Sequence, residues 1–148
     1  MRTSPRPRRP VDVCCAAALA TLDVMRDEEL VERSRRLGET LVESLGAFAL
    51  RHELIGDIRG RGLMVGAELV TDRASRAPAY LETAKVCWRS WQLGLLITFL
   101  RGNVLRMVPP LVITDAQLDR ALAILDEALT DVERGKISDD EVAQIRGW

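Results

Sequence analysis

The strongest constraint on the fold is the segment 102–132, in which a short apolar run meets two prolines and then a marked helix start. Proline lacks an amide hydrogen to donate, so Pro109 and Pro110 end any strand before them. Thr114 and Gln117 then have the spacing of a capping box, in which side chains and backbone amides bond reciprocally at a helix start. Apolar residues follow at helical spacing: Leu118, Leu122, Leu125, Leu129 and Val132. The segment predicts a strand, a stop and an amphipathic helix.

The first half of the chain predicts two helices and a hairpin. The alanine- and leucine-rich run 13–25 has little polar surface, so we expect a helix buried against other elements. Over 30–48, apolar residues recur every three, four or seven positions opposite a charged face, which predicts an amphipathic helix. Apolar residues between glycines predict strands over 55–59 and 63–70, with a turn at 60–62.

The second half of the chain adds a helix and two strands. The helix is predicted over 79–93, with Trp88 and Trp91 on an apolar stripe expected in the core. Strands are predicted over 95–99 and 103–108, joined by a short link that contains a glycine.

The order of these elements indicates an α+β fold. We expect a small, mainly antiparallel sheet of about four strands with helices packed on one face. The 148 residues suffice for one hydrophobic core. We assign 1–12 to a disordered leader rich in arginine and proline, 13–134 to the domain, and 135–148 to a polar tail with a short helix that Ser138 and Glu141 would cap.

Composition excludes several classes of protein. The formal net charge is −1, and no apolar run approaches the roughly 18 residues that span a bilayer. No signal peptide is recognisable, so we expect a cytoplasmic protein without a membrane partner. The four arginines of 1–10 allow two readings, a nucleic-acid arm or a solvated tail. Because the domain has no basic stripe with interleaved aromatic residues, we expect no nucleic-acid partner.

The three cysteines do not suggest a disulfide framework or a metal site. Cys14 and Cys15 are adjacent and Cys87 is distant in sequence, which is not a ligand spacing. We interpret all three as small buried hydrophobic residues.

Arg106 interrupts the apolar strand pattern and is the candidate binding residue. A guanidinium is always charged and matches a carboxylate with two parallel hydrogen bonds. Arg106 could therefore bind an anion, lie on the exposed face of an edge strand, or pair with an acidic neighbour. Arg59 and Arg61 form a weaker pair, which either lines the same site or lies on the surface at the hairpin turn.

Four blocks, in this order and spacing, resemble the C-terminal segment of class III pyridoxal-phosphate aminotransferases. These fold-type-I enzymes include the 4-aminobutyrate, acetylornithine and ornithine transaminases. The resemblance implies a small domain with its lead-in helices, from a homodimeric enzyme that moves an amino group between an amino acid or ω-amino acid and a 2-oxo acid. The blocks are residues 15–25, 54–70, 86–98 and 102–129.

The resemblance also implies roles for particular residues. Arg106 matches the family's arginine that binds the substrate carboxylate, and Gly102 and Asn103 match supporting positions in the turn before it. The family's Schiff-base lysine, its acidic partner of the pyridine nitrogen and its phosphate-binding loop belong to a preceding domain. Neither Lys85 nor Lys136 stands in a matching context. We therefore assign no catalytic, cofactor-binding or metal-binding residue, and expect this chain alone to bind no pyridoxal phosphate and to be inactive.

The start of the chain departs from the family pattern. Residues 6–12, "RPRRPVD", stand where the family has a glycine-rich segment that ends in a cap such as Asn-Pro. We therefore expect a truncated chain or a wrongly assigned start. The alternative is a non-catalytic binding or dimerisation module derived from that domain. The sequence does not identify the amino donor, nor does it separate an aminotransferase from an aminomutase.

Overall fold

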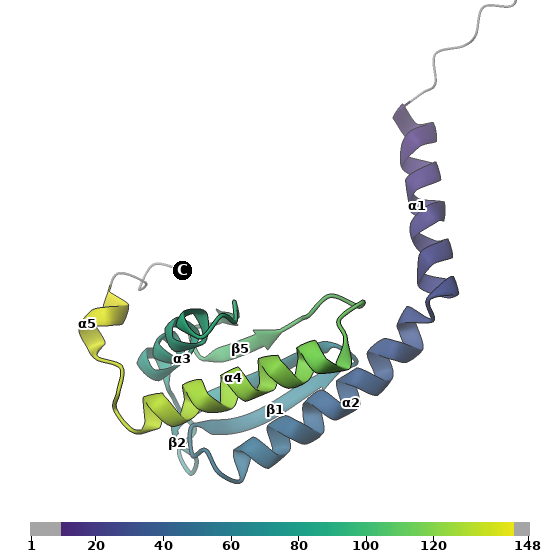
Figure 1. Cartoon of the computed structure of the whole chain (residues 1–148). Helices are drawn as coiled ribbons and strands as arrows, with labels where there is room; N and C mark the ends of the chain where they lie inside the picture. Colours follow the sequence, from purple (N-terminus) through teal and green to yellow (C-terminus); the bar gives the residue numbers. More distant parts are fainter. Residues whose placement is uncertain (1–9, 144–148) are drawn as a thin grey trace, which may run out of the picture.

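The computed structural model describes residues 10–143, which form five helices and five strands (Figure 1). In chain order these are α1 (Pro10–Asp27), α2 (Leu30–Ala49), β1 (Ile55–Arg61), β2 (Met64–Asp72), β3 (Ala77–Pro78), α3 (Tyr80–Gln92), β4 (Thr98–Leu100), β5 (Val104–Met107), α4 (Asp115–Glu133) and α5 (Asp139–Val142).

The sheet is antiparallel at every pairing and has the strand order β1-β2-β5-β4, with β3 pairing the end of β2. At its centre, Ala67 of β2 lies opposite Ile58 of β1 and Leu105 of β5. Side chains alternate between a buried and a more exposed face along β2 and β5. This alternation is typical of an antiparallel sheet with one face on the core. The predicted small antiparallel sheet is confirmed.

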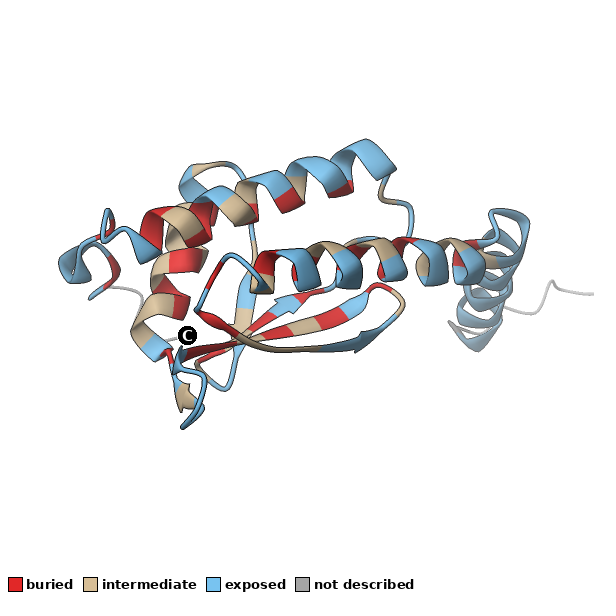
Figure 2. Cartoon of the chain, turned by 90° about the horizontal axis from the view of Figure 1, so that it is seen from below, coloured by how far each residue is buried: buried red, intermediate tan, exposed pale blue. Residues whose placement is uncertain are grey.

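Helices α2 and α4 run along the same face of the sheet (Figure 1, Figure 2). The buried apolar side chains of these helices, of α3 and of the inward face of the sheet form one core. Arg36 of α2 joins Asp115 at the start of α4 through two hydrogen bonds of 2.9 and 3.1 Å. Both halves of the predicted capping box at Thr114 and Gln117 are formed. The predicted layer of helices on one face is confirmed.

The hairpin forms as predicted, but its turn lies further along the chain. Strand β1 continues through Gly60 and Arg61, and the reversal falls between Arg61 and Met64. Gly62 has a φ of 54° there, which glycine adopts without a side-chain clash. The turn packs on α2, where Ser34 Oγ accepts a hydrogen bond of 3.1 Å from the Leu63 amide. This contact fixes the hairpin tip against the helix.

Helix α1 forms, but its predicted burial is wrong. Val13, Leu19 and Leu22 keep 62%, 63% and 60% of their surface exposed. The helix projects away from the sheet and its layer of helices (Figure 1). Its C-terminal end leads into α2, and no other element in the described part of the chain packs along it. An apolar helix is buried only where a second surface covers it, and sequence periodicity does not report that surface.

The predicted domain boundary at residue 12 falls inside α1. The helix begins at Pro10, and proline suits the first helical turn because its fixed φ is pre-organised there. Asp12 adds an acidic group near the positive end of the helix dipole. The disordered leader is predicted over residues 1–12. Residues 10–12 are helical, and residues 1–9 lie outside the described residues.

Two further expectations are corrected at the edge of the core. Trp91 was expected in the core but is 56% exposed, and it stacks on the half-buried Trp88 with ring centroids 4.8 Å apart. Strand β4 begins only at Thr98, because Leu95 and Ile97 pack against the core outside the strand ladder. The spacing of apolar residues places both tryptophans on one stripe of the helix. It does not show that the end of α3 and the link after it lie at the edge of the core.

The cysteines differ in environment. Cys14 and Cys15 are exposed on α1, which contradicts the expectation of burial, and Cys87 on α3 is partly buried. At the other end of the chain, Ser138 and Glu141 form the predicted capping box of α5. None of the helices in the described region is both long and apolar enough to cross a membrane.

Candidate functional site

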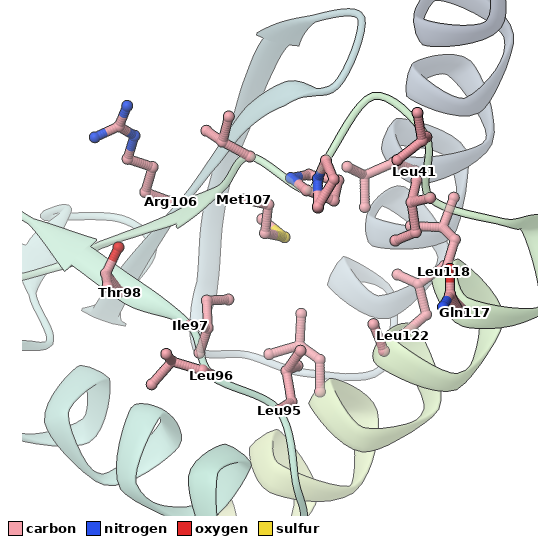
Figure 3. A pocket seen from close by; sticks show the side chains of 17 residues that line it. Leu41, Leu95, Leu96, Ile97, Thr98, Arg106, Met107, Gln117, Leu118 and Leu122 are labelled. Atoms are coloured by element: carbon pink, nitrogen blue, oxygen red, sulfur yellow. The ribbon is translucent and has the colours of Figure 1, made fainter.

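Arg106 lies on the face of the sheet opposite the helices. Its neighbours on β5, Leu105 and Met107, are buried toward the core with 1% and 9% of their surface exposed, whereas Arg106 is exposed. Figure 3 shows its side chain directed away from the cavity that Met107 enters. Within residues 10–143, no carboxylate pairs with the Arg106 guanidinium. The apparent misfit in the sequence is therefore ordinary strand alternation with the charge on the open face.

Three residues on neighbouring strands form a row with Arg106. Gly66 of β2 lies directly opposite Arg59 of β1 on one side and Arg106 of β5 on the other. Thr98 of β4 completes the row beyond Arg106. Neighbouring strands are about 4.8 Å apart, so the backbones of the two arginines stand about 10 Å apart. Gly66 has no side chain of its own, and the nearest side-chain atom to the place that its Cβ would take is Val104 Cγ1, at 3.2 Å.

The two arginines differ in their partners. Arg59 Nη1 donates to Asp57 Oδ2 at 2.5 Å and to Glu68 Oε2 at 2.8 Å. These hydrogen bonds, the one to Glu68 first and then the one to Asp57, raise the pKa of Arg59. Arg59 is therefore held by two carboxylates, whereas Arg106 keeps its donors available. Arg61, the other arginine noted in the hairpin, lies at the end of β1 opposite Met64.

Gly102 and Asn103 shape the turn that leads into β5. Gly102 has a φ of 85°, and a Cβ atom there would come within 2.6 Å of the Tyr80 ring. Asn103 is buried, and its Nδ2 donates to the Leu69 carbonyl at 3.0 Å. Their role in supporting the site stays a prediction. The sequence did not predict the contacts of this turn with Tyr80 and Leu69. These residues come next to the turn only when β2, α3 and the turn pack together.

A cavity of about 700 Å³ opens on the helix side of β5 (Figure 3). Its walls are the link before β4, the end of β5, the proline segment and the first half of α4. Most of the lining is apolar, including Leu95, Ile97, Met107, Leu118 and Leu122. It therefore suits an apolar group. Arg106 and Thr98 also border this cavity, and Figure 3 shows the Arg106 guanidinium directed away from it.

Neither lysine fits a Schiff-base site. The sequence contains only Lys85 and Lys136. Lys85 Nζ lies 2.6 Å from Asp139 Oδ1, and Lys136 Nζ lies 2.6 Å from Asp131 Oδ1. Each amine is therefore engaged in an ion pair with a carboxylate and is not directed at a cofactor. The described residues also include no cluster of three or more side chains that could hold a metal ion.

A family model of class-III aminotransferases matches residues 12–129 of this chain. The chain belongs to the class-III aminotransferase family. This match covers the whole sheet, helices α2 and α3, and most of α1 and α4. The family resemblance inferred from the four sequence blocks is confirmed.

Characterised relatives of this class-III chain include racemases and aminotransferases. Leucine/methionine racemase of Thermococcus litoralis is 43% identical over 136 residues, which is 92% of this chain and 31% of that protein. Isoleucine 2-epimerase of Lentilactobacillus buchneri is 43% identical over 92% of this chain and 30% of its own. 5-Aminovalerate aminotransferase of Pseudomonas aeruginosa is 40% identical over 81% of this chain and 29% of its own. The chain thus spans about a third of the length of these relatives.

Solved structures of class-III relatives have the same fold. An aminotransferase from Bacillus anthracis superposes with a TM-score of 0.75 and 36% identity, over 78% of this chain and 27% of that one. An amine transaminase from an uncultivated Pseudomonas species, solved in its pyridoxal-phosphate-bound internal aldimine form, gives a TM-score of 0.74 and 30% identity over 80% and 27%.

Proposed function

We propose that this chain is the small-domain part of a pyridoxal-phosphate-dependent enzyme acting on amino acids, in which Arg106 binds the substrate carboxylate. The observation that carries the proposal is the state of Arg106 on the open face of the sheet. Its guanidinium has no carboxylate partner within the described residues, although Asp57 and Glu68 lie on the same face. A free, directed guanidinium beside a glycine leaves room for an external carboxylate.

The chemistry of the guanidinium suits this role. Two parallel N–H donors match the two oxygens of a carboxylate, which fixes the orientation of the ligand as well as binding it. A domain that covers the open face of the sheet would strengthen the ion pair between Arg106 and the carboxylate, because water then screens the two charges less. Pyridoxal phosphate would supply the electron sink for changes at the amino acid's α-carbon. Because neither lysine of this chain fits it, we assign no step through the cofactor to these residues.

The first candidate reaction is amino-group transfer between an amino acid or ω-amino acid and a 2-oxo acid. The aminotransferases among the sequence and structural relatives support it. The second candidate is racemisation or epimerisation of an amino acid, which the identity of 43% over 92% of this chain to a racemase and to an epimerase supports. Both reactions act on substrates with a carboxylate, so the proposed role of Arg106 is the same in each.

The test of Arg106 uses the full chain and pyruvate as the carboxylate probe. The Nε–Hε signals of the arginines are followed by NMR during titration, with pyruvamide as the neutral control. We expect the Arg106 signal to shift and saturate at lower pyruvate concentration than that of Arg61, and Arg106→Gln to leave no such response. An Arg106 signal that responds no more than that of Arg61 would overturn the carboxylate role.

The two reactions are separated by the product formed without an acceptor. An enzyme that includes these residues and a large domain is given one enantiomer of leucine and no 2-oxo acid. A racemase converts it to the other enantiomer over many turnovers, whereas an aminotransferase stops after one amino group per cofactor. Turnover to the D-enantiomer would exclude simple amino-group transfer.

A further inference from the structure

Glu68 lies diagonally between the two arginines of the open face. On β2 it stands opposite Asp57 of β1 and Val104 of β5. Arg59 stands two residues after Asp57 on β1, and Arg106 stands two residues after Val104 on β5. Diagonal neighbours on one face of a sheet are about 7 to 8 Å apart at their backbones, which long side chains can bridge. By position alone, Glu68 is able to pair with either arginine.

In the structure Glu68 pairs with Arg59. The distance from Arg59 Nη1 to Glu68 Oε2 is 2.8 Å, and the same nitrogen lies 2.5 Å from Asp57 Oδ2. Asp57 and Glu68 are directly opposite each other across the strands, an arrangement in which two like charges destabilise a sheet unless a cation compensates them. Arg59 supplies that cation. Both acids next to the row are thereby engaged away from Arg106.

We propose that Arg59 is a positioning residue, which keeps the Arg106 guanidinium free for substrate by holding Glu68 on the far side of Gly66. This inference rests on the proposed function of Arg106. Without Arg59, the two carboxylates of Asp57 and Glu68 lose their cation. Glu68 then turns past the Val104 side chain, which borders the space above Gly66, to bind Arg106. An internal carboxylate then competes with the external one for the same donors. Arg59 acts on the binding of substrate without contacting it.

The test compares four forms of the full chain: wild type, Arg59→Gln, Glu68→Gln and the double variant. Without ligand, we expect the Arg106 Nε–Hε signal to shift in Arg59→Gln and to return in the double variant, which has no carboxylate at residue 68. The pyruvate concentration at half-saturation of Arg106 should rise about two- to fivefold in Arg59→Gln, the range that exposed ion pairs contribute. The double variant should regain the wild-type value.

The matched control is Arg61→Gln, which removes an arginine from the same strand two residues further on. It should leave both the ligand-free Arg106 signal and the half-saturation concentration unchanged. If Arg59→Gln does not fold, Arg59→Lys takes its place, because lysine keeps the charge but holds the two carboxylates with a flexible, strongly hydrated ammonium in place of the planar guanidinium. It should give a smaller shift in the same direction.

The outcomes separate this inference from the function on which it rests. No pyruvate response at Arg106 in the wild type overturns the carboxylate role, while the ligand-free signal still reports whether Arg59 controls Glu68. A normal pyruvate response together with an unchanged Arg106 signal in Arg59→Gln overturns the positioning role alone. Failure of the double variant to restore the signal also overturns it, because the effect would then not pass through Glu68.

Discussion

Asn103 and Leu69 exchange two hydrogen bonds across the sheet. The Leu69 amide donates to the Asn103 carbonyl at 2.7 Å, and Asn103 Nδ2 donates back to the Leu69 carbonyl at 3.0 Å. One bond comes from the backbone and the other from the side chain, so they close a ring that joins the end of β2 to the entry of β5. Arg106 follows three residues later, and its direction depends on this junction.

Asn103→Ala should destabilise the chain by about 0.5 to 1.5 kcal/mol, because it removes one of the two donors to the Leu69 carbonyl, which keeps its hydrogen bond of 3.1 Å from the Ala79 amide. Urea unfolding followed by circular dichroism measures the change. An unchanged midpoint would show that the backbone bond alone secures the junction.

Gly102→Ala should cost more than Gly94→Ala. Both glycines have positive φ, 85° and 96°, but only at residue 102 would a Cβ atom meet another side chain, the Tyr80 ring. We expect Gly94→Ala to lower the free energy of unfolding by about 1 kcal/mol through backbone strain alone. Gly102→Ala should lower it by about 2 to 3 kcal/mol, because the clash adds to the strain. Gly46→Ala, in an open position of α2, is the control and should stabilise the helix by about 0.5 to 1 kcal/mol. Equal losses at 94 and 102 would contradict the clash.

Arg106→Gln should leave the free energy of unfolding within about 0.5 kcal/mol of the wild type, because the guanidinium is exposed and contacts no described carboxylate. The same urea titration tests it. A larger loss would reveal a structural role and weaken the assignment of this arginine to a ligand.

The three thiols should react in two classes. Burial raises the pKa of the Cys87 thiol to about 12, so little of it is thiolate at neutral pH, whereas Cys14 and Cys15 are exposed on α1. An aromatic disulfide reagent at pH 8 should modify two thiols quickly and the third only after denaturation. Modification of all three at one rate would show that α3 opens readily.

Asp131 should make the free energy of unfolding fall at acidic pH. Hydrogen bonds from Lys136 and from Arg89 hold the pKa of this buried carboxyl below its usual value. A lowered folded-state pKa stabilises the fold above the unfolded pKa of about 3.9, and this contribution disappears as the pH falls toward the folded value. Unfolding between pH 5 and pH 3 should therefore become easier in the wild type. Asp131→Asn should show a smaller change over that interval, and an equal change would place the acid sensitivity elsewhere.

Local signals predicted the elements that local physics controls. The capping box at Thr114 and Gln117 forms as expected, because all of its donors and acceptors lie within four residues. The strand around Arg106 was predicted over 103–108 and forms over Val104–Met107, but its alternation was not predicted, because Arg106 interrupts a run that is otherwise apolar. Such features need no information from distant parts of the chain.

Tertiary context decided what the sequence did not show. Trp91 is apolar and correctly spaced, but it lies at the helix end where the core stops. The hairpin turn moved because β1 pairs with β2 as far as Arg61 and Met64, which depends on the contact of Gly62 with α2. The partners of Arg59 were likewise unpredictable, because strand register and not spacing brings Glu68 near two arginines.

The bare face of the sheet has a thermodynamic consequence. Arg106 and the covering domain in the proposed enzyme would share one ligand, so binding of that ligand and docking of that domain are linked. If docking tightens carboxylate binding tenfold, the carboxylate tightens docking by the same factor, about 1.4 kcal/mol. Bound substrate would then stabilise the contact between the sheet and the covering domain, and its release would weaken that contact. An unpaired arginine on an open surface can in this way contribute to domain assembly once its ligand is bound.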